Sequence, residues 1–187
     1  MKIAPWVLVL LSAMFLAQWA VPASMIWRHE RVLAKGQEFK FRTRPVDPYD
    51  AFRGRYVALS FEQESAPLAG ATQHLERGRE IFAFLENDTN GFARIKCVAL
   101  ERPSTGAYII AKTRYASTPH NVSIQFAFDR YYLNEKLAPE AEAAYREHSR
   151  RGQHDAYVTV RVLNGLAVIK DLYVANQPIL QFLKKQN

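Results

Sequence analysis

The chain has 187 residues, which is enough for one ordinary domain with an attached segment and too few for two domains of usual size. Hydrophobic residues make up 49% of the sequence and charged residues 23%, a globular composition that excludes a protein with many membrane spans. The formal charge of +7 suits an anionic partner such as lipid headgroups or nucleic acid. No nucleic-acid-binding motif is present, so we expect no nucleic-acid partner.

An uncharged apolar segment spans residues 3–27. As a helix rising about 1.5 Å per residue, its 25 residues exceed the roughly 30 Å hydrocarbon thickness of a bilayer. Trp6 and Trp27 lie near its two ends, and amphipathic indole rings favour the membrane interface. We therefore predict a transmembrane helix over residues 1–27 that acts as a signal anchor in contact with membrane lipid, followed by a domain over residues 28–187.

The same segment also resembles a cleaved signal peptide, because Lys2 gives a basic start and residues 21–23 offer small side chains for cleavage. A retained anchor is favoured, since residues 25–27 prolong the apolar stretch and Pro22 makes a poor cleavage context. A signal-like start usually leaves the N-terminus in the cytoplasm, whereas the basic residues after Trp27 favour a cytoplasmic domain. Of these two orientations we expect the first: a single-pass protein of the inner membrane with a periplasmic domain.

After the membrane segment, apolar residues recur at every second position, which is the pattern of strands with one face on a core. Residues 55–61 place Val57, Leu59 and Phe61 on one face, and residues 122–128 show the same alternation. Further strands are predicted at residues 81–85, 92–100 and 108–112.

The clearest supersecondary signal is a C-terminal hairpin. Alternating valines at residues 158–162 lead to Asn164-Gly165, a turn pair that accepts positive φ, and residues 168–174 return. One helix is predicted over residues 139–150, with proline in its first turn. The fold class is therefore mainly β, with an antiparallel barrel or sandwich-like domain and one short helix after the membrane helix.

The sequence offers no cofactor site. Cys97 is the only cysteine, which excludes an intrachain disulfide and a cysteine-based zinc cluster. The five histidines show no paired metal spacing, and no Gly-rich phosphate loop or nucleophile elbow appears. We expect no metal, no cofactor and no catalytic set.

Residues 45–61 carry a family resemblance. Gly54, Tyr56 and Leu59 fit the pattern GDYxxLxY, and the chain resembles the bacterial family named for that motif. Arg55 stands in place of the motif aspartate and Phe61 in place of its last tyrosine, so an acid and a hydroxyl are lost. The resemblance implies a membrane helix followed by one domain of unknown function, in proteins often encoded beside multi-span membrane proteins.

The loop that leads into the motif is the expected binding surface, because loops on a rigid sheet commonly carry binding residues. Asp47 suits a cap for one helical turn. We expect Tyr131 and Tyr132 at a groove or at the rim of the core. The predicted binding residues are Asp47, Asp50, Arg53, Arg55 and Tyr56.

These features predict a membrane-anchored, non-catalytic binding or accessory module with an integral membrane protein as its partner. Gln18 fits this prediction, since a polar residue within the span either bonds to a partner span or marks a tolerated kink at Pro22. As an alternative, Ser24 at the end of the apolar stretch and Lys96 on a strand resemble the Ser/Lys pair of type I signal peptidases, or of an inactive fold relative. The Pro-Thr that follows the family's serine-methionine pair is absent, and Arg94 shares the face of Lys96.

Overall fold

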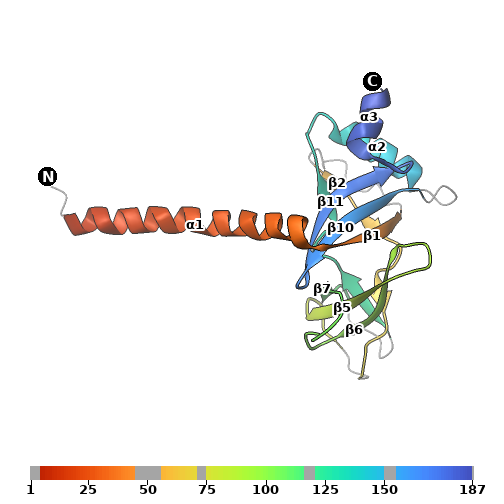
Figure 1. Cartoon of the computed structure of the whole chain (residues 1–187), viewed down its shortest axis with the longest axis horizontal. Coiled ribbons are helices and arrows are strands. Elements are labelled where there is room, and N and C mark those ends of the chain that lie inside the picture. The colour runs from red at the N-terminus through yellow and green to blue at the C-terminus, as the bar shows by residue number, and fades with distance from the viewer. Residues whose placement is uncertain (1–4, 45–55, 71–74, 116–120, 150–154, 187) are drawn as a thin grey trace.

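The computed structural model describes residues 5–44, 56–70, 75–115, 121–149 and 155–186. One long helix, α1 (Pro5–Lys35), projects from a β-rich domain, as Figure 1 shows. Two short helices, α2 (Ala138–His148) and α3 (Ile179–Gln186), pack against each other and against one sheet at one end of the domain.

Five of the described strands form the first sheet, in the order β12-β11-β10-β1-β3, with antiparallel pairing throughout. β10 and β11 are the predicted hairpin, and Asn164 (φ 51°) and Gly165 (φ 86°) make its turn as expected. The bounds of this sheet are β1 Gln37–Arg44, β3 Ser60–Phe61, β10 Tyr157–Leu163, β11 Leu166–Val174 and β12 Gln177–Pro178.

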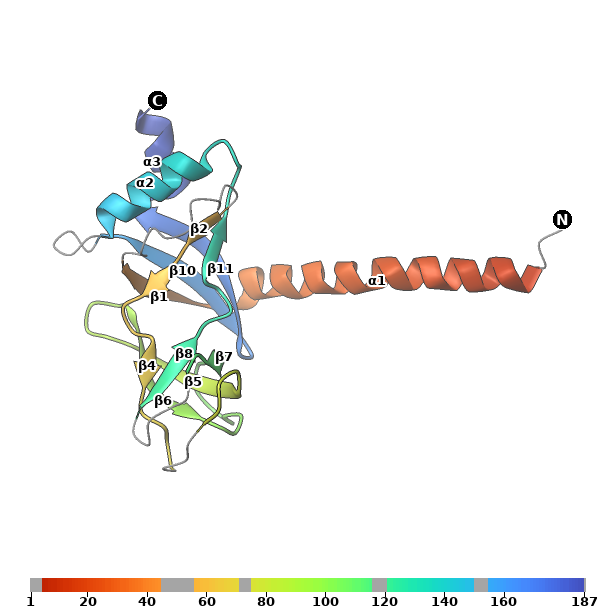
Figure 2. The same cartoon turned by 180° about the vertical axis from the view of Figure 1, so that it is seen from behind.

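Five further strands form the second sheet, in the order β4-β8-β7-β5-β6, and β2 pairs with β9 alone. Figure 2 shows the second sheet in the half of the domain opposite α2 and α3. The bounds are β2 Tyr56–Ala58, β4 Ser65–Ala66, β5 Glu80–Asn87, β6 Ala93–Ala99, β7 Tyr108–Thr113, β8 Val122–Gln125 and β9 Arg130–Tyr132.

The predicted fold class is confirmed: the protein is mainly β, antiparallel and sandwich-like. The described strands do not close into a barrel, so the sandwich is the better of the two predicted architectures. The predicted helix is α2, with its alanines buried. The structure also has a second short helix, α3, which was not predicted: Ile179 and Leu183, four residues apart, bury one of its faces against the sheet.

The core between the sheets is centred on four phenylalanines. Their ring centroids lie 5.0 to 6.1 Å apart, mostly in edge-to-face or tilted geometry, which suits aromatic quadrupoles. Val57, Leu59 and Phe61 are all buried, as their alternation predicted. Residues 56–61, which form β2 and β3 and which we call the motif strand, therefore anchor the core. The four rings are those of Phe41, Phe61, Phe126 and Phe128.

α1 is apolar and exposed along most of its length. By length and composition it is able to cross a membrane as one span within Trp6–Lys35. The helix continues past Trp27, where the predicted span ends, for eight residues, 28–35. Only near its end does it meet the domain, where Val32 is 3% exposed and α1 packs on β10 and β11.

Candidate functional site

The motif strand lies between two clefts, and Tyr56, its first residue, lies beside the larger one. Tyr56 on β2 stands opposite Tyr132 on β9, with the two ring centroids 5.6 Å apart. The Arg130 guanidinium lies 5.0 Å from the centre of the Tyr56 ring, within reach of a cation–π interaction. The motif tyrosine thus helps to hold the basic and aromatic side chains of β9 in place.

The larger cleft, which we name the helix-side cleft, has a volume of about 480 Å³. It lies between the base of α1, strand β9 and strand β11, and Figure 2 shows β11 beside the base of α1. Three segments that are far apart in the sequence build it, and they contribute an imidazole, two cations and two tyrosines to its lining. It is lined by His29, Ala127, Phe128, Arg130, Tyr131, Tyr132, Ala167, Val168, Ile169 and Lys170.

Exposed ion pairs hold the two cations of the helix-side cleft. Lys170 Nζ lies 2.9 Å from a Glu38 carboxylate oxygen, and Arg130 Nε lies 3.6 Å from one of Asp129. The hydrogen bond from Lys170 is the main reason that the pKa of Glu38 lies below its usual value. Pairs this exposed contribute at most about 1 kcal/mol each, so a ligand anion can replace either carboxylate at low cost.

The tyrosines of the helix-side cleft have different roles. Tyr131 is part-buried, and its hydroxyl donates a 3.1 Å hydrogen bond to Asp171. Burial, followed by the Asp171 charge, raises the pKa of Tyr131, so this hydroxyl stays protonated and keeps its donor role. Tyr132 is 65% exposed and presents its ring to the outside. The cleft thus offers cations, one exposed ring and an apolar floor, which suit an anionic group attached to an apolar body.

The wall formed by α1 is fixed to the sheet by a clamp of Gly36, Glu38, Arg161 and Lys170. One Arg161 nitrogen donates to the Gly36 carbonyl at 2.8 Å, and another lies 3.0 Å from the Glu38 carboxylate. Glu38 in turn accepts from Lys170. Helix and cleft therefore keep one relative orientation.

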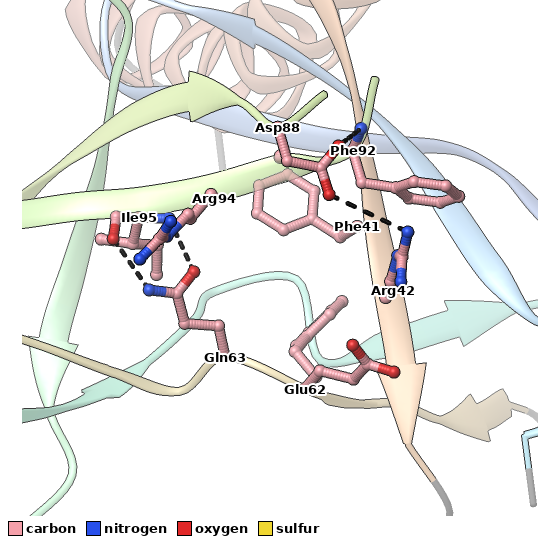
Figure 3. A pocket seen from close by; sticks show the side chains of 10 residues that line it. Phe41, Arg42, Glu62, Gln63, Asp88, Phe92, Arg94 and Ile95 are labelled. Carbon is pink, nitrogen blue, oxygen red and sulfur yellow. Dashed lines mark hydrogen bonds and ion pairs between the residues drawn. The ribbon is translucent and has the colours of Figure 1, made fainter. Parts of the chain in front are cut away.

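The smaller cleft, with a volume of about 190 Å³, lies at the other end of the motif strand (Figure 3). Three of its polar side chains make contacts within the protein, although the buried Arg42 Nε has no hydrogen-bond partner among the described residues. The Gln63 amide exchanges two 2.8 Å hydrogen bonds with the Ile95 backbone, and Asp88 accepts from the Phe92 N–H at 2.8 Å. Arg42 stacks 4.3 Å from the Phe92 ring centre, with a guanidinium nitrogen 3.8 Å from Asp88. We therefore assign these side chains a packing role.

The carboxylate of Glu64 accepts hydrogen bonds from residues of the motif. Glu64, whose side chain is 9% exposed, accepts from Arg44 at 2.9 Å, from Arg114 at 2.6 Å and from the Ser60 hydroxyl at 3.0 Å. The Phe61 backbone N–H adds a fourth hydrogen bond. This network ties β1, β3 and the end of β7 together, so it joins the two sheets.

Among the predicted binding residues, Tyr56 lies beside the helix-side cleft. The other four, Asp47, Asp50, Arg53 and Arg55, lie outside the described residues. Tyr131 and Tyr132 both line the cleft, and Tyr131 also packs against the rim of the core.

The two residues of the hydrolase alternative lie on different parts of the molecule. Ser24 is exposed on α1 and donates to the Val21 carbonyl at 2.7 Å. It precedes the end of α1 by 11 residues, or about 16 Å of helix. Lys96 is exposed on β6 in the second sheet. The structure does not bring the two together, and the described residues contain no group of three side chains able to hold a metal ion.

His29, Arg130 and Lys170 were not predicted as site residues. Tyr131 and Tyr132 were the sequence signal near them, and this signal concerned the rings rather than the cations. His29 and Lys170 become neighbours of β9 only through the junction of α1 with the sheet, which no local pattern encodes.

Comparisons with known proteins agree with the motif. No curated protein and no solved structure matches the chain. The model of the family described as GDYXXLXY protein matches residues 18–172, from the middle of α1 to β11. The matched range contains the junction, the motif strand and every residue that lines the helix-side cleft. The chain therefore belongs to the GDYXXLXY family.

Proposed function

We propose that this protein is a membrane-anchored, non-catalytic binding module that serves an integral membrane protein as an accessory subunit. The observation that carries the proposal is that α1, an exposed apolar helix, runs without a break into a clamped junction beside the helix-side cleft. A bilayer would cover the apolar helix, and the rigid junction would present the cleft to whatever lies next to the helix at the membrane surface.

The partner is proposed to be a membrane protein because of Gln18. In the described part of the chain the Gln18 amide makes no hydrogen bond, although it sits within the apolar helix. A polar side chain facing lipid tails is costly, and a second span supplies the missing donor or acceptor. Pro22 lacks the backbone N–H that would bond to the carbonyl of Gln18, one turn earlier, so a second polar group lies at the same level of the helix.

Affinity purification of the full-length chain in mild detergent tests this function. We expect one integral membrane protein to co-purify in constant ratio, and to be lost when Gln18→Leu removes the amide. Ala17→Leu, the neighbouring position, is the matched control and should retain the partner. Repeated recovery of the bare chain, or equal recovery from both variants, would contradict the proposal. So would release of the full-length chain from membranes by alkaline carbonate.

We further propose that α1 lies in the inner membrane with the domain in the periplasm. Thiol labelling tests on which side of the membrane the domain lies, because Cys97 is the only native cysteine. In a Cys97→Ala background, Lys184→Cys introduces a thiol at an exposed position of α3. A membrane-impermeant maleimide should label it in intact spheroplasts. Labelling only after lysis would place the domain in the cytoplasm.

A further inference from the structure

We propose that the helix-side cleft binds the phosphate-bearing headgroup of an anionic phospholipid in the membrane that α1 enters. This inference rests on the proposed membrane anchoring and adds a specific lipid site to it. The site residues are His29 on α1, Arg130 and Tyr132 on β9, and Lys170 on β11.

The position of the cleft along α1 carries the first step. The headgroup layer on each side of a bilayer is about 5 to 7 Å thick, because the hydrocarbon core is about 30 Å and the whole bilayer 40 to 45 Å. Trp27 ends the uncharged stretch, and His29 follows two residues, or about 3 Å of helix, later. The α1 wall of the cleft therefore lies at the depth of lipid phosphates, not above them.

Charge complementarity carries the second step. The Arg130 and Lys170 side chains are 52% and 47% exposed, and their present carboxylate partners, Asp129 and Glu38, are 44% and 33% exposed. Such pairs exchange partners readily, and both Arg and Lys bind phosphate oxygens. Arg28 and Arg31 on α1 lie within two residues of His29 and outweigh the one carboxylate of Glu30, with Arg31 held 5.4 Å from the Trp27 ring.

The remaining surface of the cleft suits the rest of a phospholipid. Tyr132 is 65% exposed, and amphipathic rings of this kind favour the interface between headgroups and acyl chains. Ala167, Val168 and Ile169 form an apolar strip on β11 beside the cations. A phosphate on Arg130 and Lys170 would leave the glycerol backbone against this strip and the acyl chains directed along α1.

Native mass spectrometry of the full-length chain tests the lipid site. The detergent-solubilised protein is incubated with equal amounts of phosphatidylglycerol and phosphatidylcholine, and bound lipids are counted by mass. We expect the phosphatidylglycerol adduct to exceed the phosphatidylcholine adduct, and Arg130→Gln to lower this preference about fivefold. This variant leaves all four residues of the clamp unchanged, including the Glu38–Arg161 pair. Arg130→Gln with Lys170→Gln should abolish the preference.

The control carries the same charge change elsewhere. Arg77→Gln with Lys184→Gln removes one exposed arginine and one exposed lysine outside the cleft, and should keep the wild-type lipid preference. Equal binding of the two lipids by the wild type, or equal loss in control and cleft variants, overturns the lipid site. If either result comes from a chain that resists carbonate extraction and retains its membrane partner, the proposed function stands and this inference alone fails.

Discussion

The Arg161 guanidinium on β10 donates a 2.8 Å hydrogen bond to the carbonyl oxygen of Gly36, the residue that follows the last turn of α1. The two residues are 125 positions apart in the chain. The carbonyls at a helix C-terminus carry partial negative charge, so a cation at this position also favours the helix end. The direction of α1 relative to the sheet is therefore set by the domain and not by a flexible linker.

Replacing Gly36 by alanine should weaken this junction. A Cβ at Gly36 would lie 2.5 Å from the Val32 carbonyl oxygen and 3.0 Å from the Val162 backbone nitrogen. These are backbone atoms, which cannot turn aside, so α1 or β10 must shift. We expect Gly36→Ala to lower the free energy of unfolding by about 2 kcal/mol, measured by urea unfolding of the full-length chain in mild detergent.

Lys35→Ala is the matched control for Gly36→Ala. Lys35 is the exposed last residue of α1 and precedes the glycine directly. Its truncation should change the free energy of unfolding by less than about 0.5 kcal/mol. An unchanged stability in Gly36→Ala would show that the junction yields easily and that the clamp does not fix the helix.

Glu64 is expected to be the most sensitive carboxylate in the domain. Its side chain is 9% exposed and faces two arginines. Glu64→Gln keeps the shape but presents an NH₂ group to the guanidinium donors and leaves two charges with a weaker acceptor. We expect a loss of about 3 kcal/mol in the free energy of unfolding. Glu80→Gln, at an exposed position of β5, should be nearly silent, and equal effects of the two changes would contradict a role of the network in stability.

Local patterns in the sequence predicted most of the elements. Period-two alternation predicted the hairpin of β10 and β11, because successive side chains of a strand point to opposite faces and the local sequence shows which of them is buried. It missed β1, because Lys40 and Arg42 were assigned to the basic residues that follow Trp27. Their alternation with Phe39 and Phe41, both buried, is the signal that could have revealed the strand.

The helix-side cleft could not be predicted in the same way. Its walls come from three segments that meet through the pairing order of the strands and through the clamp at Gly36. The place of Tyr56 beside Tyr132 follows from the register of β2 with β9, and that register depends on long-range contacts. Binding residues on the motif loop were inferred from their place on a loop of the sheet, and only Tyr56 among them belongs to the described residues.

Gln63 is expected to protect the outer edge of β6. Its amide donates to the Ile95 carbonyl and accepts from the Ile95 N–H, as a neighbouring strand would (Figure 3). Unpaired strand edges promote pairing with other chains. Gln63→Ala should cost about 2 kcal/mol for the two hydrogen bonds and should increase self-association, measured by urea unfolding and by light scattering after gel filtration in detergent.

The exposed Gln125 on β8 provides the control for this edge. Gln125→Ala removes the same amide from the same sheet but uncovers no edge of β6. It should leave both stability and particle mass unchanged. A monodisperse Gln63→Ala protein with wild-type stability would show that the edge is protected by neighbouring backbone of the same chain rather than by this side chain.

Alkaline pH should destabilise the domain through its buried tyrosines, of which Tyr145 is the clearest. Tyr145 is 2% exposed, its hydroxyl donates to the Arg44 carbonyl at 3.0 Å, and burial raises its pKa to about 12. The unfolded chain has a tyrosine pKa near 10, so the unfolded state loses the proton first as pH rises. The stabilising contribution is complete below about pH 10 and disappears as pH passes 12. This contribution to the free energy of unfolding is at most roughly 2 to 3 kcal/mol.

Tyr145→Phe separates the hydrogen bond from the titration. At pH 7 we expect the variant to lose about 1 kcal/mol, because the Arg44 carbonyl loses its donor. Between pH 10 and 12 its stability should fall less steeply than that of the wild type, since one buried hydroxyl no longer titrates. Tyr115→Phe, at a side chain that is 63% exposed, should follow the wild-type curve. Parallel curves for all three proteins would mean that Tyr145 ionises without opposing the fold, contrary to its burial on the inner face of α2.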